Sequence, residues 1–384
     1  MTIVQRVSSL FGALLLVAAA SPIAAAPPPQ ANNTKTVTVM TRNLYLGADV
    51  APVVAAALSG DPGALVLAVS EAWGNVQLTD FPARAEGIAR EIATEKPDLV
   101  GLQEAELWRS QTPADGVMGN AHHVEYDFVG ILLEALEGRG LHYAVVAEEK
   151  GIDIELPGYL SEANLEIGLL SDIRLTEREV ILARIDPKSS ELKLSNPKTG
   201  HFVRNVEYPI STDFTFVVRR GWASVDARTA SERFRFVTTH LEADDENVRE
   251  AQALEILAGP ADTTLPVILV ADANSNANGG LTSVAYNSFI AAGFTDAWFQ
   301  AHPGEFVSTC CADALLLLSN GLPASDDEGR IDLVLYRGAG AFSTLGVDLL
   351  GNNPATDGVL SGDGVTLIWP SDHAGVAAKL QILK

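Results

Sequence analysis

Two acceptor-bearing side chains directly follow a short apolar run in the second half of the chain. Residues 267–270 form an unbroken, β-branched run, which is typical of a strand buried on both faces. Asp272 and Asn274 come next, where that strand should end. Ligands bind at the carboxyl ends of strands in layered α/β proteins, but Asp and Asn are also common turn residues. This stretch alone predicts either a ligand site or a turn.

Other predicted strands also end in residues that can bind a divalent cation or a phosphate. Mg²⁺ takes oxygen ligands and keeps several waters, so one or two carboxylates suffice to hold it. Histidine can carry protons or donate to a phosphoryl oxygen near neutral pH. The strand ends are Asn43, Gln103 with Glu104, Thr239 with His240, Asp272 with Asn274, and Ser371 with Asp372 and His373; a sixth group, Arg330 to Asp332, opens a strand. Together these groups indicate a metal-dependent phosphoester site.

Each of these residues also has a purely structural interpretation. Glu104 and Asp372 can be solvated strand-end acids, and Asp332 can pair with the nearby Arg330. His240 can bond the Thr239 hydroxyl, and Asn43 can cap the loop that follows it. Four further residues stay outside the predicted site: Arg84 is expected on a helix surface, His122 and His123 on a surface loop, and Asp296 either near the site or at a strand edge.

The elements that must position these groups alternate between strands and helices. The period of the apolar residues predicts helices at 51–58, 64–73, 81–95, 126–137, 247–257 and 288–292. It predicts strands at 36–41, 99–102, 143–147, 166–170, 180–183, 215–218, 294–298, 331–336 and 376–382. Strands 222–226 and 234–239 should form a hairpin around Ala230 and Ser231.

Composition limits the classes of partner. The 384 residues include 47% hydrophobic ones, enough for a large core, and 26 basic against 49 acidic residues give a net charge of −23. Such a surface repels polyanions, which argues against a high-affinity nucleic-acid binder. Phosphate chemistry remains open, because a metal ion can supply local positive charge.

The first 26 residues have the pattern of a secretory signal peptide, with an apolar region at 10–20 and small residues at 24–26. We therefore expect a secreted or periplasmic protein without stable membrane insertion after cleavage. Residues 27–35 are expected to be a disordered leader, and 36–384 one catalytic domain. Cys310 and Cys311 are adjacent, so they form a vicinal bridge, stay as free thiols, or bond another molecule.

Six short motifs in order resemble the endonuclease/exonuclease/phosphatase superfamily, which includes DNase I-like nucleases and neutral sphingomyelinases. They are N-L-Y-L-G from Asn43, P-D-L-V-G-L-Q-E ending at Glu104, T-T-H-L around His240, A-D-A-N around Asp272, R-I-D ending at Asp332 and S-D-H ending at His373. The resemblance implies an α/β (α+β) fold: a four-layer α/β/β/α sandwich in which two mixed sheets pack face to face with helices outside.

The resemblance also implies roles. Glu104 would be the main ligand of Mg²⁺, with Mn²⁺ a possible substitute, and Asn43 and Asp372 would lie nearby. Asp272 would orient or activate water, Asn274 would hold a phosphoryl oxygen, and Asp332 would pair with His373. His240 would donate to the phosphate or leaving oxygen. Either Asp272 or His373 could be the general base, and the resemblance does not decide between them.

One departure from the family pattern is visible. Ala271 stands where the family usually has glycine, and alanine should fit with a modest adjustment if its φ is negative.

The favoured function is hydrolysis of a phosphodiester, a lipid or small-molecule phosphoester, by metal-assisted attack of water on phosphorus. One alternative is a secreted DNase I-like nuclease, with Arg174, Arg219 and Arg220 along a groove. Another, of a different class, is a catalytically silent binding module. The partner implied is a phosphoester substrate, and no protein partner is implied.

Overall fold

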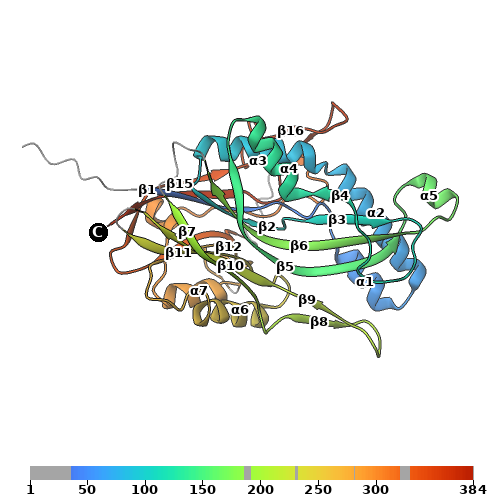
Figure 1. The fold of residues 1–384 in the computed structure, drawn as a ribbon, viewed down its shortest axis with the longest axis horizontal. Coiled ribbons are helices and arrows are strands. Elements are labelled where there is room, and N and C mark those ends of the chain that lie inside the picture. Colours follow the sequence, from blue (N-terminus) through green and yellow to red (C-terminus); the bar gives the residue numbers. More distant parts are fainter. Residues whose placement is uncertain (1–35, 186–191, 230–231, 281, 321–328, 384) are drawn as a thin grey trace, which may run out of the picture. The chain divides into compact units, whose positions relative to one another are not determined.

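Two β-sheets packed face to face form the centre of the molecule, and helices cover their outer faces (Figure 1). The computed structural model describes residues 36–185, 192–229, 232–280, 282–320 and 329–383. The larger sheet has the order β15-β18-β1-β2-β6-β3-β4, with β5 also paired to β6, and the other has the order β13-β14-β12-β11-β10-β7. Both sheets mix parallel and antiparallel pairs. The expected four-layer sandwich is confirmed.

The strand bounds of the larger sheet are β1 Thr36–Asn43, β2 Leu99–Gln103, β3 Leu107–Gln111, β4 His123–Asp127, β5 Tyr143–Gly158, β6 Ser171–Arg184, β15 Phe342–Leu350 and β18 Gly375–Ile382. Those of the second sheet are β7 Lys193–His201, β10 Gly221–Arg228, β11 Arg233–His240, β12 Val267–Asp272, β13 Thr295–Asp296 and β14 Asp332–Arg337. Two small hairpins are β8 Val206–Pro209 with β9 Thr215–Val218, and β16 Val359–Leu360 with β17 Leu367–Ile368.

The helices divide between the two outer faces. The bounds are α1 Ala51–Ser59, α2 Pro62–Leu78, α3 Phe81–Glu95, α4 Phe128–Gly138, α5 Glu162–Glu166, α6 Glu246–Ala258, α7 Val284–Ala291 and α8 Ala297–Ala301. Buried side chains of α2, α3 and α4 share one apolar cluster with the larger sheet, and those of α6 and α7 share another with the second sheet. A third cluster fills the space between the sheets. None of the described helices is long and apolar enough to cross a membrane.

The two sheets approach closely where β2 faces β11. A Cβ on Gly101 would lie 2.4 Å from the Thr238 hydroxyl oxygen, so only glycine fits there. Two residues further along β2, Gln103 donates from Nε2 to the same hydroxyl at 2.9 Å and accepts from the Thr41 hydroxyl at 3.1 Å. These buried bonds link β1, β2 and β11 beside the ends that carry the polar residues.

Most predicted elements are confirmed, but two strand predictions are wrong. Residues 166–170 do not form a strand: Glu166 ends the short helix α5, and 167–170 form the turn and loop that lead to β6. Of residues 294–298 only β13 is extended. The Asp296 carboxylate then accepts from the Trp298 backbone N–H and starts α8.

The hairpin prediction is confirmed in its strands: β10 and β11 pair antiparallel from Trp222 with Thr239 to Arg228 with Arg233. Its turn at Ala230 and Ser231 lies outside the described residues. The predicted signal peptide at 1–26 and leader at 27–35 also lie outside them.

Candidate active site

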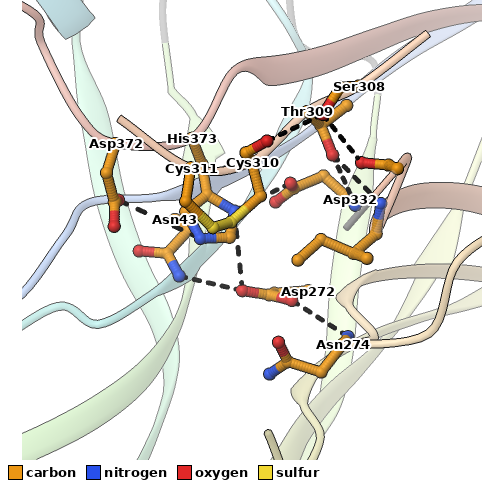
Figure 2. The surroundings of a disulfide bond; sticks show 12 residues. Asn43, Asp272, Asn274, Ser308, Thr309, Cys310, Cys311, Asp332, Asp372 and His373 are labelled. Carbon is orange, nitrogen blue, oxygen red and sulfur yellow. Dashed lines mark hydrogen bonds and ion pairs between the residues drawn. A yellow bond between two sulfur atoms is a disulfide. The ribbon is translucent and has the colours of Figure 1, made fainter. Parts of the chain in front are cut away.

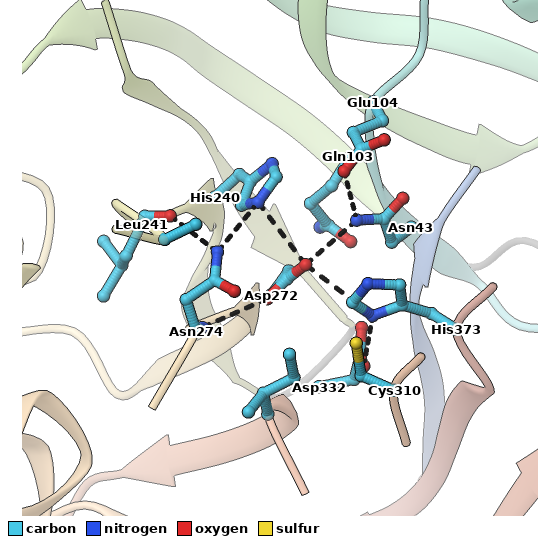
Figure 3. Close-up of polar contacts among 12 residues, drawn as sticks. Asn43, Gln103, Glu104, His240, Leu241, Asp272, Asn274, Cys310, Asp332 and His373 are labelled. Carbon is cyan, nitrogen blue, oxygen red and sulfur yellow. Dashed lines mark hydrogen bonds and ion pairs between the residues drawn. The ribbon is translucent and has the colours of Figure 1, made fainter. Parts of the chain in front are cut away.

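Strand register brings the predicted residues to one end of the sandwich. In the larger sheet, parallel β1 and β2 place Asn43 beside Gln103, one residue before Glu104. In the second sheet, parallel β11 and β12 pair His240 with Asp272, and antiparallel β14 pairs Asp332 with Asp272. Figure 3 shows these side chains converging from both sheets, with His373 joining them from the segment before β18.

Asp272 is the centre of this group. Its Oδ2 accepts from Asn43 Nδ2 at 2.9 Å and lies 3.4 Å from His240 Nε2 and 3.7 Å from His373 Nδ1. Its Oδ1 accepts from the Asn274 backbone N–H at 3.1 Å. Burial alone would raise the pKa of this carboxyl, but the two histidines and these hydrogen bonds outweigh it and hold the pKa below its ordinary value. Asp272 is therefore a buried carboxylate at neutral pH.

His373 and Asp332 form a buried pair. His373 Nδ1 lies 2.9 Å from Asp332 Oδ2, and the Asp332 side chain is fully buried. Burial lowers the pKa of His373, but the carboxylates of Asp332, Asp372 and Asp272 outweigh it and raise the pKa well above the ordinary value. This ring is an imidazolium near neutral pH. The alternative pairing of Asp332 with Arg330 is wrong, since Arg330 Nη2 contacts Asp296 at 2.5 Å.

Glu104 and Asn43 offer the oxygen ligands that a hard cation prefers. Glu104 Oε1 accepts from Asn43 Nδ2 and Oε2 from the Leu46 backbone N–H, at 2.9 and 2.7 Å. Asn43 Oδ1 accepts from the Tyr45 backbone N–H at 2.8 Å, which leaves one lone pair for a ligand. One ligand atom each from Glu104, His240 and Asp272 lie within 4.8 Å of one another. This oxygen-rich set fits a divalent ion such as Mg²⁺.

Asp372 adds another carboxylate beside this set. Burial, together with the charges of Glu104 and Asp272, raises its pKa to about 7 against the pull of His373 and Arg84. Its Oδ1 lies 3.9 Å from His373 Nε2. Carboxylates crowded in this way repel one another, so a divalent cation would lower the free energy of the group.

Two residues that orient His240 were not predicted for that role. Arg220 Nη1 donates to His240 Nδ1 at 2.8 Å and also contacts the Glu177 carboxylate, whose Oε1 lies 3.3 Å from the same ring nitrogen. Arg220 and Glu177 thus hold Nδ1 on one side of the ring, and Nε2 faces Asp272 at 3.4 Å and Asn274 Nδ2 at 3.1 Å on the other. Thr239 does not hold the ring, since its hydroxyl donates to the Gly221 carbonyl.

The placement of Arg84 on the helix surface was wrong. Its side chain is fully buried and donates to the carbonyls of Leu44, Tyr45, Thr79 and Pro370. Burial lowers its pKa to about 10. The guanidinium holds the segment after Asn43 against the segment before Asp372, so it fixes the positions of these two candidate metal ligands. Sequence alone gives little signal for this, because the four carbonyls come from three separate segments.

Backbone conformation at the site is unusual at two residues. Glu104 has φ +50° and Asn274 has φ +46°, in the left-handed region that non-glycine residues seldom adopt. Ala271, by contrast, lies within β12 and pairs with Thr239 and Leu333, so the alanine fits at this position as expected.

The adjacent cysteines form a vicinal disulfide that lies beside His373 (Figure 2). His122 and His123 are exposed, as expected, but His123 opens strand β4 and does not lie in a loop. Asp296 does not reach the site: it bonds Arg330, the Tyr286 hydroxyl and the first turn of α8.

Known structures resemble this fold over most of the chain. A Bacteroides thetaiotaomicron endonuclease/exonuclease/phosphatase family protein matches with a TM-score of 0.52 at 17% identity, over 91% of this chain and 98% of its own. A Beutenbergia cavernae endonuclease/exonuclease/phosphatase matches with 0.52 at 18%, over 90% and 72%. A Bacteroides thetaiotaomicron mannosyl-6-phosphatase matches with 0.51 at 17%, over 90% and 99%. At these identities the likeness concerns the fold.

Sequence comparison gives the family. No curated protein matches the chain. The model of the Endonuclease/Exonuclease/phosphatase family, however, matches residues 72–373, more than half of the sequence. That span contains every site residue described above except Asn43. The chain therefore belongs to the endonuclease/exonuclease/phosphatase family of metal-dependent phosphoesterases.

Proposed function

We propose that the protein is a Mg²⁺-dependent phosphodiesterase that hydrolyses a lipid or small-molecule phosphoester. The observation that carries this proposal is the buried Asp272 carboxylate, held between His240 and His373 and close to Glu104. Attack of water on phosphorus requires an acid group that orients the water and donors that stabilise the phosphoryl oxygens. The two carboxylates and the two histidines can supply these groups around one small volume. Mn²⁺ has similar ligand preferences and should substitute.

Each side chain has a role that its contacts support. Asp272 is ionised and fixed by Asn43 and the Asn274 N–H, so it can orient a water and accept its proton. His373 is charged and held by Asp332, so it can donate to a phosphoryl oxygen. His240 turns its Nε2 toward Asp272 from the opposite side, so this nitrogen lies where it can contact the phosphate or the leaving oxygen. When bound at Glu104, Asn43 and Asp372, Mg²⁺ would neutralise phosphoryl charge and make a bound water more acidic.

A nuclease remains the second candidate, and two observations weigh against it. Of the three arginines expected along a groove, Arg174 pairs with Asp153 at 2.6 Å and Arg220 pairs with Glu177 inside the site. The net charge of −23 also opposes the approach of a polyanion.

Export is a further part of the proposal, and it rests on the apolar N-terminal pattern. Expression of the full chain in a bacterial host, followed by N-terminal sequencing of the protein outside the cytoplasm, tests it. Retention of residues 1–26 on a cytoplasmic product would contradict it.

The enzymatic proposal is tested with purified protein in Mg²⁺, Mn²⁺ or EDTA. The substrates are bis-p-nitrophenyl phosphate, sphingomyelin and plasmid DNA. We expect metal-dependent hydrolysis of the first, abolished by EDTA. Cleavage of DNA alone would favour the nuclease. Hydrolysis of none of them by folded, metal-loaded protein would favour the catalytically silent binding module.

A further inference from the structure

The disulfide between Cys310 and Cys311 lies in the wall of the catalytic centre (Figure 2). The two sulfur atoms and one ring nitrogen of His373 lie within 4.8 Å of one another. Cys310 is 3% exposed and His373 is 6% exposed, so the disulfide and the imidazole are neighbours in a region that is shielded from solvent. The roles assigned above to the catalytic residues make no use of this disulfide.

The residue before the disulfide holds the surroundings of the buried Asp–His pair. Thr309 Oγ1 accepts from the backbone N–H groups of Ile331 and Asp332, at 3.0 and 3.1 Å. The Thr309 carbonyl accepts from the backbone N–H of Ala374 at 2.7 Å. One buried residue therefore fixes the backbone of Asp332 and the residue that follows His373.

The residue after the disulfide holds a candidate metal ligand. The backbone N–H of Ala312 donates to the Asp372 carbonyl at 2.9 Å. Only the two cysteines stand between this residue and Thr309, so the two anchors are separated by a single dipeptide. One anchor holds the residue before His373 and the other holds the residue after it, so the conformation of this dipeptide decides how the anchors lie relative to each other.

A disulfide between neighbouring residues closes a ring that contains their shared peptide bond. The ring removes rotational freedom from both side chains and from the backbone between them. After reduction the dipeptide regains this freedom, and the two sulfur atoms need more room because they are no longer bonded. Catalytic groups must lie within about 0.5 Å of their productive geometry, and a displacement of about 1 Å can lower the rate on the order of 10²-fold. A small shift of either anchor is therefore enough to lower turnover.

We propose that the Cys310–Cys311 disulfide is a positioning element of the active site, which fixes the two anchors around His373, and that its reduction lowers kcat. This inference rests on the proposed phosphoesterase function and adds a redox control to it. Disulfides form in the oxidising compartments to which the proposed export leads. The protein would then be weakly active inside the cell and reach full activity outside it.

The redox step needs a dithiol as reductant. A thiolate of the dithiol attacks one sulfur of the disulfide, the S–S bond breaks, and a second attack releases the dithiol as its own cyclic disulfide. Two electrons pass to the protein, and each cysteine sulfur takes up one proton. Cys311 is only partly buried, which leaves the disulfide open to attack from solvent. The chain contains 2 cysteines, so the reductant has a single target.

The first test reduces the folded protein with dithiothreitol until two thiols per chain are detected. Hydrolysis of bis-p-nitrophenyl phosphate in Mg²⁺ is then measured. We expect kcat to fall at least tenfold, KM to change less than threefold, and full activity to return on reoxidation. An unchanged kcat in protein with two free thiols would overturn the proposal. A rise in KM alone would also overturn it, because a surface that only binds substrate would give that result.

The second test removes the disulfide by substitution and so does not depend on access of the reductant. The double variant Cys310→Ser with Cys311→Ser should have a kcat at least tenfold below that of the oxidised protein. Dithiothreitol should not change its activity further, which makes this variant the matched control for the first test. A double variant as active as the oxidised protein would contradict the positioning role. Thermal unfolding is measured so that misfolded protein is recognised.

The two proposals fail in different ways. If the oxidised protein hydrolyses the ester and neither reduction nor substitution lowers kcat, the positioning role is wrong and the phosphoesterase stands. If the oxidised protein hydrolyses no ester, hydrogen exchange measured by nuclear magnetic resonance decides the positioning role. The amides of Ile331, Asp332 and Ala374 should exchange at least tenfold faster in the double variant, while those of β10 and β11 keep their rates. Equal rates for these three amides in the two proteins would remove the positioning role.

Discussion

Asp272 keeps its negative charge in a buried position because two histidines and two N–H donors surround it. Replacing the carboxylate by an amide of the same shape should therefore remove the proton acceptor without emptying the space. We expect Asp272→Asn to lower kcat/KM at least 10³-fold, with the midpoint of thermal unfolding within a few degrees of the original. Steady-state kinetics and thermal unfolding measure the two effects. The exposed Asp262→Asn is the control; a loss below tenfold in Asp272→Asn would contradict the role.

Arg220 acts on His240 through a single ring nitrogen. In Arg220→Met the Nδ1 atom loses its donor and faces the Glu177 carboxylate at 3.3 Å, so the ring can change its tautomer or turn. We expect kcat to fall about tenfold or more while KM changes less than threefold. The adjacent, exposed Arg219→Met should behave like the original protein. A rise in KM with unchanged kcat would instead make Arg220 a substrate-binding residue.

The position of a candidate site residue could be predicted from the sequence where its polar side chain ends or directly follows a strand. The positions of Asn43, Glu104, His240 and Asp272 at strand ends were predicted in this way, because the end of a buried strand is visible in the apolar pattern. Glu177 and Arg220 gave no comparable signal. Glu177 lies inside β6 and Arg220 just before β10, and only the packing of the two sheets brings them to His240.

At the scale of elements, Arg84 joins α3 to both loops that carry metal-ligand candidates. In Arg84→Met four carbonyls lose their buried donor, and the apolar side chain cannot replace it. We expect a loss of about 3 kcal/mol in the free energy of unfolding, measured by urea denaturation, together with lower activity. Arg90→Met, on the exposed face of the same helix, should cost less than about 0.5 kcal/mol. Equal losses in the two variants would contradict a supporting role for Arg84.

Two predicted strands differ from the structure in kind or in length, for different physical reasons. Residues 294–298 are apolar and β-prone, but the Asp296 side chain caps the next turn and converts most of the segment to helix. The predicted strand at 143–147 is the start of β5, which extends to Gly158 because it pairs with β6 along nearly its whole length. The first outcome comes from a local cap, and the second from a strand partner that a local pattern does not contain.

At the scale of the whole molecule, the space between the sheets holds more acid than base near the site. Glu106, Glu149, Glu177 and Glu179 are all buried, and Glu149 stands directly opposite Glu179 in the β5–β6 pair. Burial, reinforced by the charge of Glu177, raises the pKa of Glu106 and Glu179 well above the ordinary value and that of Glu149 to about 8. Glu106, Glu149 and Glu179 therefore favour the protonated form in the folded state.

Such raised values make stability fall as the pH rises. The unfolded chain releases the Glu149 proton near pH 4.5, while the folded protein keeps it to about pH 8. Between these values the folded state binds more protons, so the free energy of unfolding decreases with pH. Below about pH 4.5 both states are protonated and this group has no effect.

Glu149→Gln should remove this dependence. Its amide stays neutral, so we expect the variant to be more stable than the original at pH 8, on the order of a few kcal/mol, and equally stable near pH 4.5. Urea denaturation in EDTA at pH 4.5, 6.5 and 8 measures the slope, with the exposed Glu137→Gln as control. If Glu149→Gln loses stability with pH as steeply as the original protein, the buried carboxyl is not the source of the slope. The excess charge of −23 would then be the simpler cause, since repulsion at the surface also grows as the pH rises.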